Sequence, residues 1–317
     1  MRLWWGKIFP LMFSLAYGLF LSMLPIDAFM DRVNYISYAN SSILILMRYI
    51  EEGKLVFLFN EPVWLMINVC LNYLFEAETV VRIIIGLSAS LSAFLVLKHN
   101  NNNVIWLVLI LFSPQIIKNY IIHLRQGVGI CFFIIGWFSA SKKIKAVFYL
   151  FAMLTHSSFF IVLFLLFFER TLEHSRISYG LRISLFMGLG LLAGFYLVDI
   201  SEFLGARQSQ LYDSLVPNVS GSGFIYWLII FFMFITSGAE FIRGNCFSIQ
   251  VIAFYLTTYF FIVFSGRIFE SAMLIVTLSV LHLPGSRKLI GMVFFVVYIA
   301  FLYLQKINTP YLGFGAV

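Results

Sequence analysis

Long apolar runs separated by short polar turns follow one another along almost the whole chain. Their residues do not alternate between apolar and polar, as the strands of a membrane β-barrel would. Several runs contain about 20 residues, the length that a helix needs to cross a bilayer. The pattern predicts an all-α polytopic membrane protein with about 10–12 transmembrane or half-membrane helices. The apolar segments are expected at residues 4–24, 55–75, 79–97, 104–118, 121–140, 144–168, 182–199, 223–242, 248–265, 267–283 and 288–305.

Composition supports this fold class and a single integral membrane domain over residues 1–317. The chain is 62% hydrophobic and 11% charged, whereas soluble domains are about 45–50% apolar. The first apolar segment follows Arg2 and Lys7, and no small-residue cleavage site comes after it, so we expect a retained first helix. External polar loops are predicted at 25–54 and 199–222.

Charge distribution predicts a break in one apolar segment. The polar segment 25–54 has more acids than bases and is expected outside, whereas the lysine-rich turn 142–145 is expected inside. Four complete crossings between them would place both on the same side, so one segment must fail to span. Segment 55–75 is the best candidate, because Asn-Glu-Pro at 60–62 interrupts it.

A second break is suggested in segment 144–168, where Thr-His-Ser-Ser occupies 155–158. Two arms would each be about 18 Å long, against a hydrocarbon core of about 30 Å, and His156 would lie below the outer surface. One unbroken helix with a satisfied histidine is the alternative, and the pattern does not decide between them. With both breaks, the candidate polar residues fall on one outward side, namely Glu61, His123, Arg125, His156 and Arg267.

The first candidate site is His-Leu-Arg-Gln-Gly at 123–127, between two nearly uncharged runs. Arg125 keeps its proton, so its place at the edge of hydrocarbon costs several kcal/mol unless water or an anion meets it. An arginine that snorkels to lipid headgroups is the simpler interpretation. Gln115, Lys118 and Asn119 make the preceding turn polar as well, which favours an anionic ligand.

Two further candidates lie nearer the N-terminus. Asp31, Tyr35 and Tyr38 would share one face of an external helix, although each tyrosine could simply anchor that helix at the membrane interface. Glu61 precedes Pro62 at the start of an apolar helix, where it could cap the helix. Such a carboxylate could also have a raised pKa and act as a general base.

A late candidate is Ser-Gly-Arg at 265–267, between two apolar helices. Arg267 could pair with Glu270 on the same helix face. Alternatively, Arg267 and Arg125 could converge on a pyrophosphate, which suits the fork geometry and permanent charge of guanidinium groups.

No pattern indicates a cofactor, a metal ion or nucleic acid. The chain contains no Walker loop, dinucleotide-binding glycine pattern, CxxC or HExxH. Its three cysteines stand singly in apolar segments, as small buried residues would. The net charge of +7 is better explained by topology than by nucleic acid, because cytoplasmic loops collect lysine and arginine.

In the order of these elements the chain resembles the EpsG-like, Wzy-type polymerases of bacterial surface polysaccharides, and its early part also looks like the wider GT-C membrane glycosyltransferases. The resemblance covers about residues 25–270. The residues that carry it are Asp31, Tyr35, Tyr38, Glu61, Pro62, Arg82, Leu124, Arg125, Gln126, Gly127, Lys142, Lys143, His156, Ser157, Ser158, Gly266 and Arg267.

The resemblance implies a GT-C-like fold in the bacterial inner membrane and a metal-independent glycosyl transfer, without cofactor, on the periplasmic face. The donor would be a growing glycan on undecaprenyl pyrophosphate, and the acceptor a lipid-linked repeat unit. Membrane lipids, a chain-length regulator and a flippase would be further partners.

The resemblance also implies roles for the candidate residues. Arg125 and Arg267 would hold the pyrophosphate and stabilise its developing charge. His156 or His123 would bind phosphate or assist proton transfer, and Glu61 or Asp31 would position or deprotonate the acceptor hydroxyl. Substrate contacts would come from Gln126, Tyr35, Tyr38, Arg207 and Tyr212.

Three other activities are compatible with parts of the pattern. An O-antigen ligase or another lipid-linked glycosyltransferase would use the same donor with a different acceptor. A flippase or transporter would be expected to show internal repeats and charges at mid-membrane, and we find no convincing repeat. A membrane acyltransferase would need a histidine-centred transfer site that no motif singles out.

Overall fold

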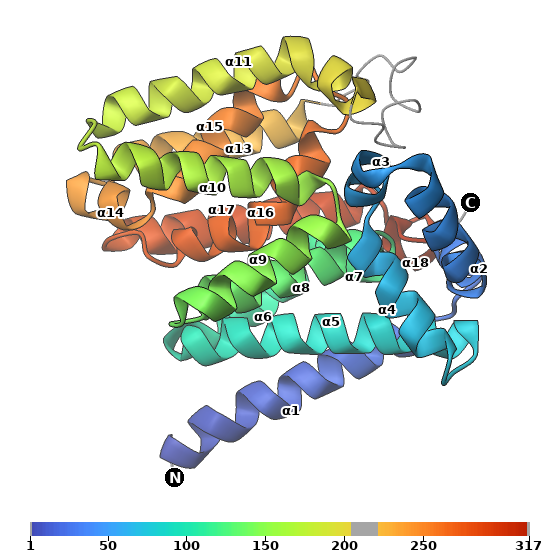
Figure 1. The fold of residues 1–317 in the computed structure, drawn as a ribbon. Helices are drawn as coiled ribbons and strands as arrows, with labels where there is room; N and C mark the ends of the chain where they lie inside the picture. The colour runs from blue at the N-terminus through green and yellow to red at the C-terminus, as the bar shows by residue number, and fades with distance from the viewer. Residues whose placement is uncertain (1, 204–220, 316–317) are drawn as a thin grey trace. The chain divides into compact units, whose positions relative to one another are not determined.

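The described parts of the chain fold into helices, most of them connected by short turns (Figure 1). A computed structural model describes residues 2–203 and 221–315, and within these ranges every regular element is a helix. The backbone divides into two compact units, Met1–Ser157 with Ile299–Val317 and Ser158–Tyr298. The all-α prediction is therefore confirmed, and each unit is described by itself below.

The first unit contains the N-terminal helices and the last short helix. Its elements are α1 (Arg2–Met23), α2 (Met30–Glu52), α3 (Lys54–Phe59), α4 (Pro62–Asn72), α5 (Ala77–His99), the 3-10 helix η1 (Asn101–Asn103), α6 (Val104–Leu111), α7 (Pro114–Ile121), α8 (Leu124–Phe138), α9 (Lys142–Thr155) and α18 (Pro310–Gly313).

The second unit contains α10 (Ser158–His174), α11 (Tyr179–Phe203), α13 (Ser222–Ile235), α14 (Ala239–Gly244), α15 (Cys246–Thr258) and α16 (Ser265–Val280). Helix α17 (Ser286–Leu304) begins in this unit and ends in the first.

Helix length and hydropathy indicate a multi-pass membrane protein. Helix α5, the Tyr179–Leu197 part of α11, and α17 are long and apolar enough to cross a bilayer, and the bent stretch Asn101–Ile121 would make a fourth crossing. Several other apolar helices are shorter, such as α8 and α15. The long apolar runs of the sequence thus include helices of about half the membrane thickness as well as complete spans.

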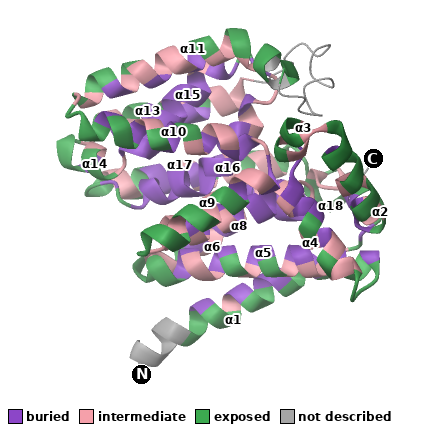
Figure 2. Cartoon of the chain, viewed as in Figure 1, coloured by how far each residue is buried: buried purple, intermediate pink, exposed green. Residues whose placement is uncertain are grey.

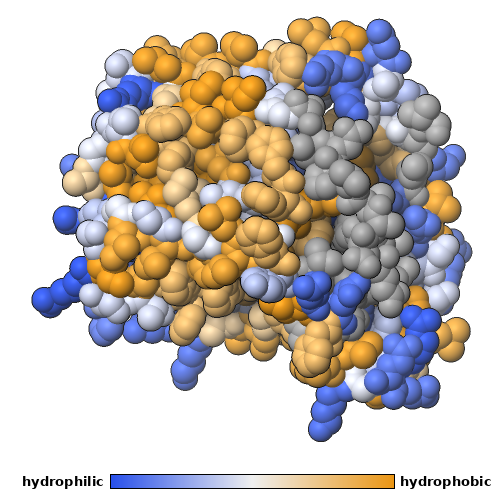
Figure 3. Space-filling model, turned by 90° about the horizontal axis from the view of Figure 1, so that it is seen from above, coloured by the Kyte–Doolittle hydropathy of each residue, from blue (hydrophilic) through white to orange (hydrophobic). Residues whose placement is uncertain are grey.

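Many apolar side chains are exposed, as lipid-facing helices require. Leu19 of α1, Phe195 of α11 and Val297 of α17 are all more than half exposed, and exposed positions are frequent along α11 in Figure 2. On the face drawn in Figure 3, apolar side chains cover large areas.

The predicted break in segment 55–75 is present, and in segment 144–168 the structure shows the broken alternative. Segment 55–75 breaks between α3 and α4, where Pro62 is the first residue of the new helix. Segment 144–168 breaks between α9 and α10, at His156. A third break, which the hydrophobic pattern did not reveal, separates α6 from α7 with a bend of 70°. Its signal is Pro114, because proline favours the first helical turn and restricts the residue before it.

Small residues bring α1 and α5 into close contact in the first unit. A Cβ atom added at Gly18 would lie 2.0 Å from Oγ of Ser90 and 2.4 Å from the carbonyl oxygen of Gly86. Only glycine therefore fits at this crossing, as is common where membrane helices approach closely. Helix α5 also packs against α2 and α8, and α8 packs against α9, so α5 supports most of the first unit.

Arg32 connects two helix ends inside the first unit. Its guanidinium is fully buried and donates to the carbonyl oxygen of Ile121 (2.8 Å) at the end of α7 and of Leu24 (3.0 Å) just after α1. It also reaches the carbonyls of Pro25 and Leu21. The last carbonyls of a helix lack partners within the helix, and Arg32 satisfies them. This contact fixes the start of α2 beside the turn between α7 and α8.

Helix α15 is the centre of the second unit, where it contacts α10, α11, α13 and α16. A buried ion pair lies beside it: Nη1 of Arg182 is 2.9 Å from Oε1 of Glu169. Gln250 of α15 donates to the other carboxylate oxygen of Glu169. Because both charged side chains are buried, each depends on the other for compensation.

We predict that Glu169→Leu will destabilise the protein by about 3–5 kcal/mol, because it leaves the Arg182 charge buried without its partner. The double variant Glu169→Leu/Arg182→Met should lose much less, since it removes both charges. Thermal unfolding in detergent measures the difference. Equal losses in the single and double variants would show that the ion pair is not the source of the effect.

Candidate functional site

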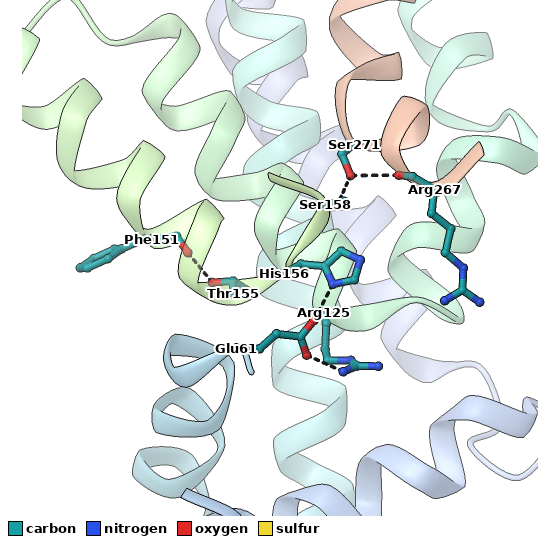
Figure 4. Close-up of polar contacts among 8 residues, drawn as sticks. All are labelled: Glu61, Arg125, Phe151, Thr155, His156, Ser158, Arg267 and Ser271. Carbon is teal, nitrogen blue, oxygen red and sulfur yellow. Dashed lines mark hydrogen bonds and ion pairs between the residues drawn. The ribbon is translucent and has the colours of Figure 1, made fainter. Parts of the chain in front are cut away.

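The carboxylate of Glu61 lies between two basic side chains of the first unit (Figure 4). Its Oε2 accepts a hydrogen bond from Nη1 of Arg125, and its Oε1 is 2.6 Å from Nδ1 of His156. Glu61 and His156 are buried, and Arg125 is about three-quarters buried. These three residues, called the Glu61 cluster below, come from the break between α3 and α4, from the first turn of α8, and from the end of α9.

The break before α4 places the Glu61 carboxylate. Glu61 has φ 61° and ψ 51°, the left-handed region, which costs a residue with a side chain about 1–2 kcal/mol. Pro62 disfavours a right-handed helical conformation of the residue before it, and Asn60 ends α3 by donating from Nδ2 to the carbonyl of Val56 at 2.7 Å. Strained backbone of this kind gathers at functional sites.

The turn between α7 and α8 places Arg125. The backbone N–H groups of Ile122 and His123 both donate to the carbonyl of Lys118, which ends α7, and α8 begins at the next residue. A Cβ atom at Gly127 would lie 2.3 Å from the carbonyl oxygen of Asn119. The glycine of the sequence motif therefore lets α8 pack directly on α7, and this contact fixes the direction in which Arg125 extends.

Asp31, Tyr35 and Tyr38 lie on α2, whose spacing predicted that they share one helix face, and they lie beside the residues of the α7–α8 turn. Oδ2 of Asp31 lies 3.6 Å from Nδ1 of His123. The hydroxyl of Tyr35 interacts with the Arg125 guanidinium, and the ring centroid of Tyr38 lies 5.8 Å from Cζ of that guanidinium. Three residues of α2 thus face the basic residues of the α7–α8 turn.

The end of α9 places His156. Its backbone N–H donates to the carbonyl of Ala152 at 3.1 Å, which completes the last turn of the helix. Thr155, which is fully buried, donates from its hydroxyl to the carbonyl of Phe151 at 2.6 Å (Figure 4). Because the helix stops here, the imidazole extends from its end toward Glu61.

The electrostatics of Glu61 differ from the sequence-based expectation. Burial by itself raises the pKa of the Glu61 carboxyl, but the charge of Arg125 and the hydrogen bonds from His156 and Arg125 lower that pKa to about 2. The expected raised pKa is therefore wrong, because two basic groups surround the carboxylate. A carboxylate with a low pKa is a weak base, so Glu61 is a poor proton acceptor. Its two hydrogen bonds suit it instead to hold Arg125 and His156 in position.

The other candidate residues are more dispersed. Arg267 lies in the second unit, in the first turn of α16, where its carbonyl accepts from the hydroxyl of Ser271 (Figure 4). Gln126 is buried in the first turn of α8. Arg82 donates to the carbonyl of Ser22 and pairs with Glu78 on its own helix, so it supports the packing of α1 on α5. Arg207 and Tyr212 lie outside the described residues.

The sequence did not reveal which candidates pair with one another, or the structural role of Arg32. No spacing signal exists for the pairing, because the paired residues lie far apart in the chain, and the contact of Arg32 with Ile121 spans 89 residues. Within the two described ranges, no group of three or more His, Cys, Asp and Glu side chains is arranged to hold a metal ion. No protein-family model, curated protein or solved structure matches the chain significantly.

We predict that Gly127→Ala will destabilise the protein by about 1–3 kcal/mol, the usual effect of overpacking, and will displace Arg125. Gly180→Ala is the matched control, because a Cβ atom there meets nothing within 4 Å. Thermal unfolding of both variants in the same detergent tests this. A Gly127→Ala variant as stable as the control would contradict the close α7–α8 contact.

The low pKa of Glu61 predicts a pH dependence of stability. Since the folded-state pKa lies below the ordinary value of 4.5, the carboxylate stabilises the fold above that value and loses its contribution as pH falls toward 2. Glu61→Gln should therefore be less stable than the wild type at pH 7, and the difference should shrink below pH 4.5. Unfolding midpoints measured across this range test the sign; a constant difference would be inconsistent with it.

Proposed function

We propose that this chain is a polymerase of bacterial surface polysaccharide, which transfers a growing glycan from undecaprenyl pyrophosphate to a lipid-linked repeat unit. The observation that carries the proposal is the Glu61 cluster, built where two helices break in a strongly apolar chain. Ionisable residues at membrane helices are rare and mostly functional, and this cluster gathers three of them with the Asp31 face of α2 beside it.

Three features of Arg125 support an anionic ligand. Its guanidinium is permanently charged and can bind two oxygen atoms of a phosphate at once. Its Nε is buried and has no hydrogen-bond partner among the described residues, so a donor is available that a phosphate oxygen would satisfy. Glu61 already shows how Arg125 and His156 each bind one oxygen of a single anionic group.

The surroundings of Arg125 support a glycan on that anion. Tyr38 is partly exposed, and its ring faces the guanidinium. Asp31, on the same helix, lies beside His123. An aromatic ring and a carboxylate offer the stacking surface and the hydrogen-bond acceptors that a sugar needs. A carrier with a charged head, a sugar and a long lipid tail matches the polar cluster and the apolar exterior together.

In the proposed reaction the acceptor hydroxyl attacks the anomeric carbon of the donor. The bond between that carbon and the phosphate oxygen breaks, and undecaprenyl pyrophosphate leaves with the electron pair. Arg125 stabilises the charge that develops on the leaving group, which is commonly among the largest catalytic contributions. His156 binds the phosphate, and Glu61 orients His156 and Arg125.

Further parts of the proposal concern residues away from this cluster. Gln126, Tyr35, Arg207 and Tyr212 contribute to substrate binding. The fold is related to the GT-C enzymes, with the site on the periplasmic face of the inner membrane. A chain-length regulator and a flippase act with the protein.

Reconstitution tests the function directly. Purified full-length protein in lipid nanodiscs, given a lipid-linked repeat unit, should produce a ladder of glycan lengths on the carrier lipid. Transfer of one glycan to a different acceptor lipid would instead indicate a ligase, and movement of the carrier across the bilayer without a new glycosidic bond would indicate a flippase. Either result would overturn the polymerase proposal.

We predict that Arg125→Lys will lower kcat by about 10²–10³-fold, the usual effect of losing one donor to a developing charge. Lysine keeps the positive charge but cannot bind two oxygens as a fork does. Arg48→Lys is the matched control, because Arg48 is well exposed and pairs with Glu52 on its own helix. Normal polymerisation by Arg125→Lys would exclude the pyrophosphate role.

A further inference from the structure

The site contains a second ionisable pair that the Glu61 cluster does not use. Asp31 and His123 face each other at 3.6 Å, and their side chains are 41% and 22% exposed. Both residues of this pair are thus more open to solvent than Glu61 and His156, whose side chains are 8% and 6% exposed. A substrate that arrives from outside can reach the open pair without disrupting the buried one.

The two pairs differ in what they can do with a proton. Both oxygens of Glu61 are already bound by basic groups, and its pKa of about 2 makes it a poor acceptor. Nδ1 of His156 is occupied by the same carboxylate. The reaction still requires that the acceptor hydroxyl lose its proton, so another group must receive it.

The position of His123 suits that task. Its backbone is fixed to Lys118 at the end of α7, and Arg125 follows two residues later. Asp31 faces Nδ1 of the imidazole, which favours the tautomer with hydrogen on Nδ1 and a lone pair on Nε2. Of the nearby titratable groups, Asp31 on α2 faces the imidazole, while Lys118 on α7 and Arg125 on α8 flank His123 along the chain.

We propose that His123 is the general base that accepts the proton of the acceptor hydroxyl, and that Asp31 is the residue that positions its imidazole. The inference rests on the proposed polymerase function and deepens it. As the hydroxyl oxygen bonds to the anomeric carbon, its proton moves to Nε2 of His123. The donor's bond to phosphate breaks, Arg125 holds the leaving pyrophosphate, and His123 afterwards releases the proton to water.

The proposed base role predicts a specific kinetic effect of replacing His123. His123→Ala should lower kcat by about 10²–10⁴-fold, the typical contribution of general acid–base catalysis, while KM for the lipid-linked donor stays unchanged. Added imidazole should restore part of the rate, because it can occupy the space of the missing side chain. His174→Ala is the control, since His174 is exposed at the end of α10 in the second unit.

Asp31→Asn provides a second variant at a more exposed position. It keeps the shape of the side chain but removes the charge that orients the imidazole, so kcat should fall less than in His123→Ala. The double variant Asp31→Asn/His123→Ala should be no slower than His123→Ala alone, because Asp31 acts through His123. Strictly multiplicative effects would contradict the positioning role.

The outcomes separate this inference from the function on which it rests. If the wild type forms no ladder, the polymerase proposal fails, and the base role fails with it. If the wild type forms a ladder but His123→Ala retains the wild-type rate, only the base role fails. A His123→Ala variant that raises KM for the donor and does not respond to imidazole would show that His123 binds the substrate instead.

Discussion

Burial of the Glu61 carboxylate is the constraint on which the site depends. Removing an ionised carboxylate from water costs several kcal/mol unless charged hydrogen-bond donors replace the water. Arg125 and His156 provide those donors, and they stand 64 and 95 residues further along the chain. One charge therefore requires α8 and α9 to present their ends at the point where α4 begins, and the packing of α8 on α5 and on α9 supports that arrangement.

Broken helices make this arrangement geometrically available. A side chain in the middle of a long apolar helix projects sideways, whereas a residue at a helix end can approach residues at other ends. Glu61, Arg125 and His156 all lie at or next to helix ends. Irregular backbone at such points leaves polar groups that need hydrogen-bond partners. Nearby side chains supply such partners, for example Asn60 and Thr155, each of which donates to the carbonyl group four residues earlier.

Much of the site could be predicted from the sequence because its residues are chemically unusual where they occur. Glu61, Arg125 and His156 interrupt apolar runs, and Pro62 marks the break before α4. Their pairing could not be predicted, since it depends on long-range packing rather than on spacing. The direction of the Glu61 pKa was wrong for the same reason, because burial was visible in the pattern but the neighbouring bases were not.

For the fold too, features set by neighbouring residues could be predicted, whereas contacts between distant segments could not. Helical periodicity and breaks at proline are local, and the break in segment 55–75 that charge distribution predicted is present. The bend at Pro114 was missed because the flanking apolar residues hide it in the hydrophobic pattern. Arg32 has an ordinary sequence context, and only the meeting of the ends of α1 and α7 gives it its role.

The burial of Arg32 also changes the electrostatic field around α2. In segment 25–54 the sequence places four acids against three bases, but Arg32 is fully buried against carbonyl groups. Arg48 and Lys54 are then the exposed bases among Asp27, Asp31, Glu51 and Glu52. Small anions that diffuse toward this surface meet a negative potential, which salt at physiological strength screens beyond about 8 Å. The surface formed by segment 25–54 is therefore more acidic than its sequence count of acids and bases suggests, and the reach of its charge depends on the salt concentration.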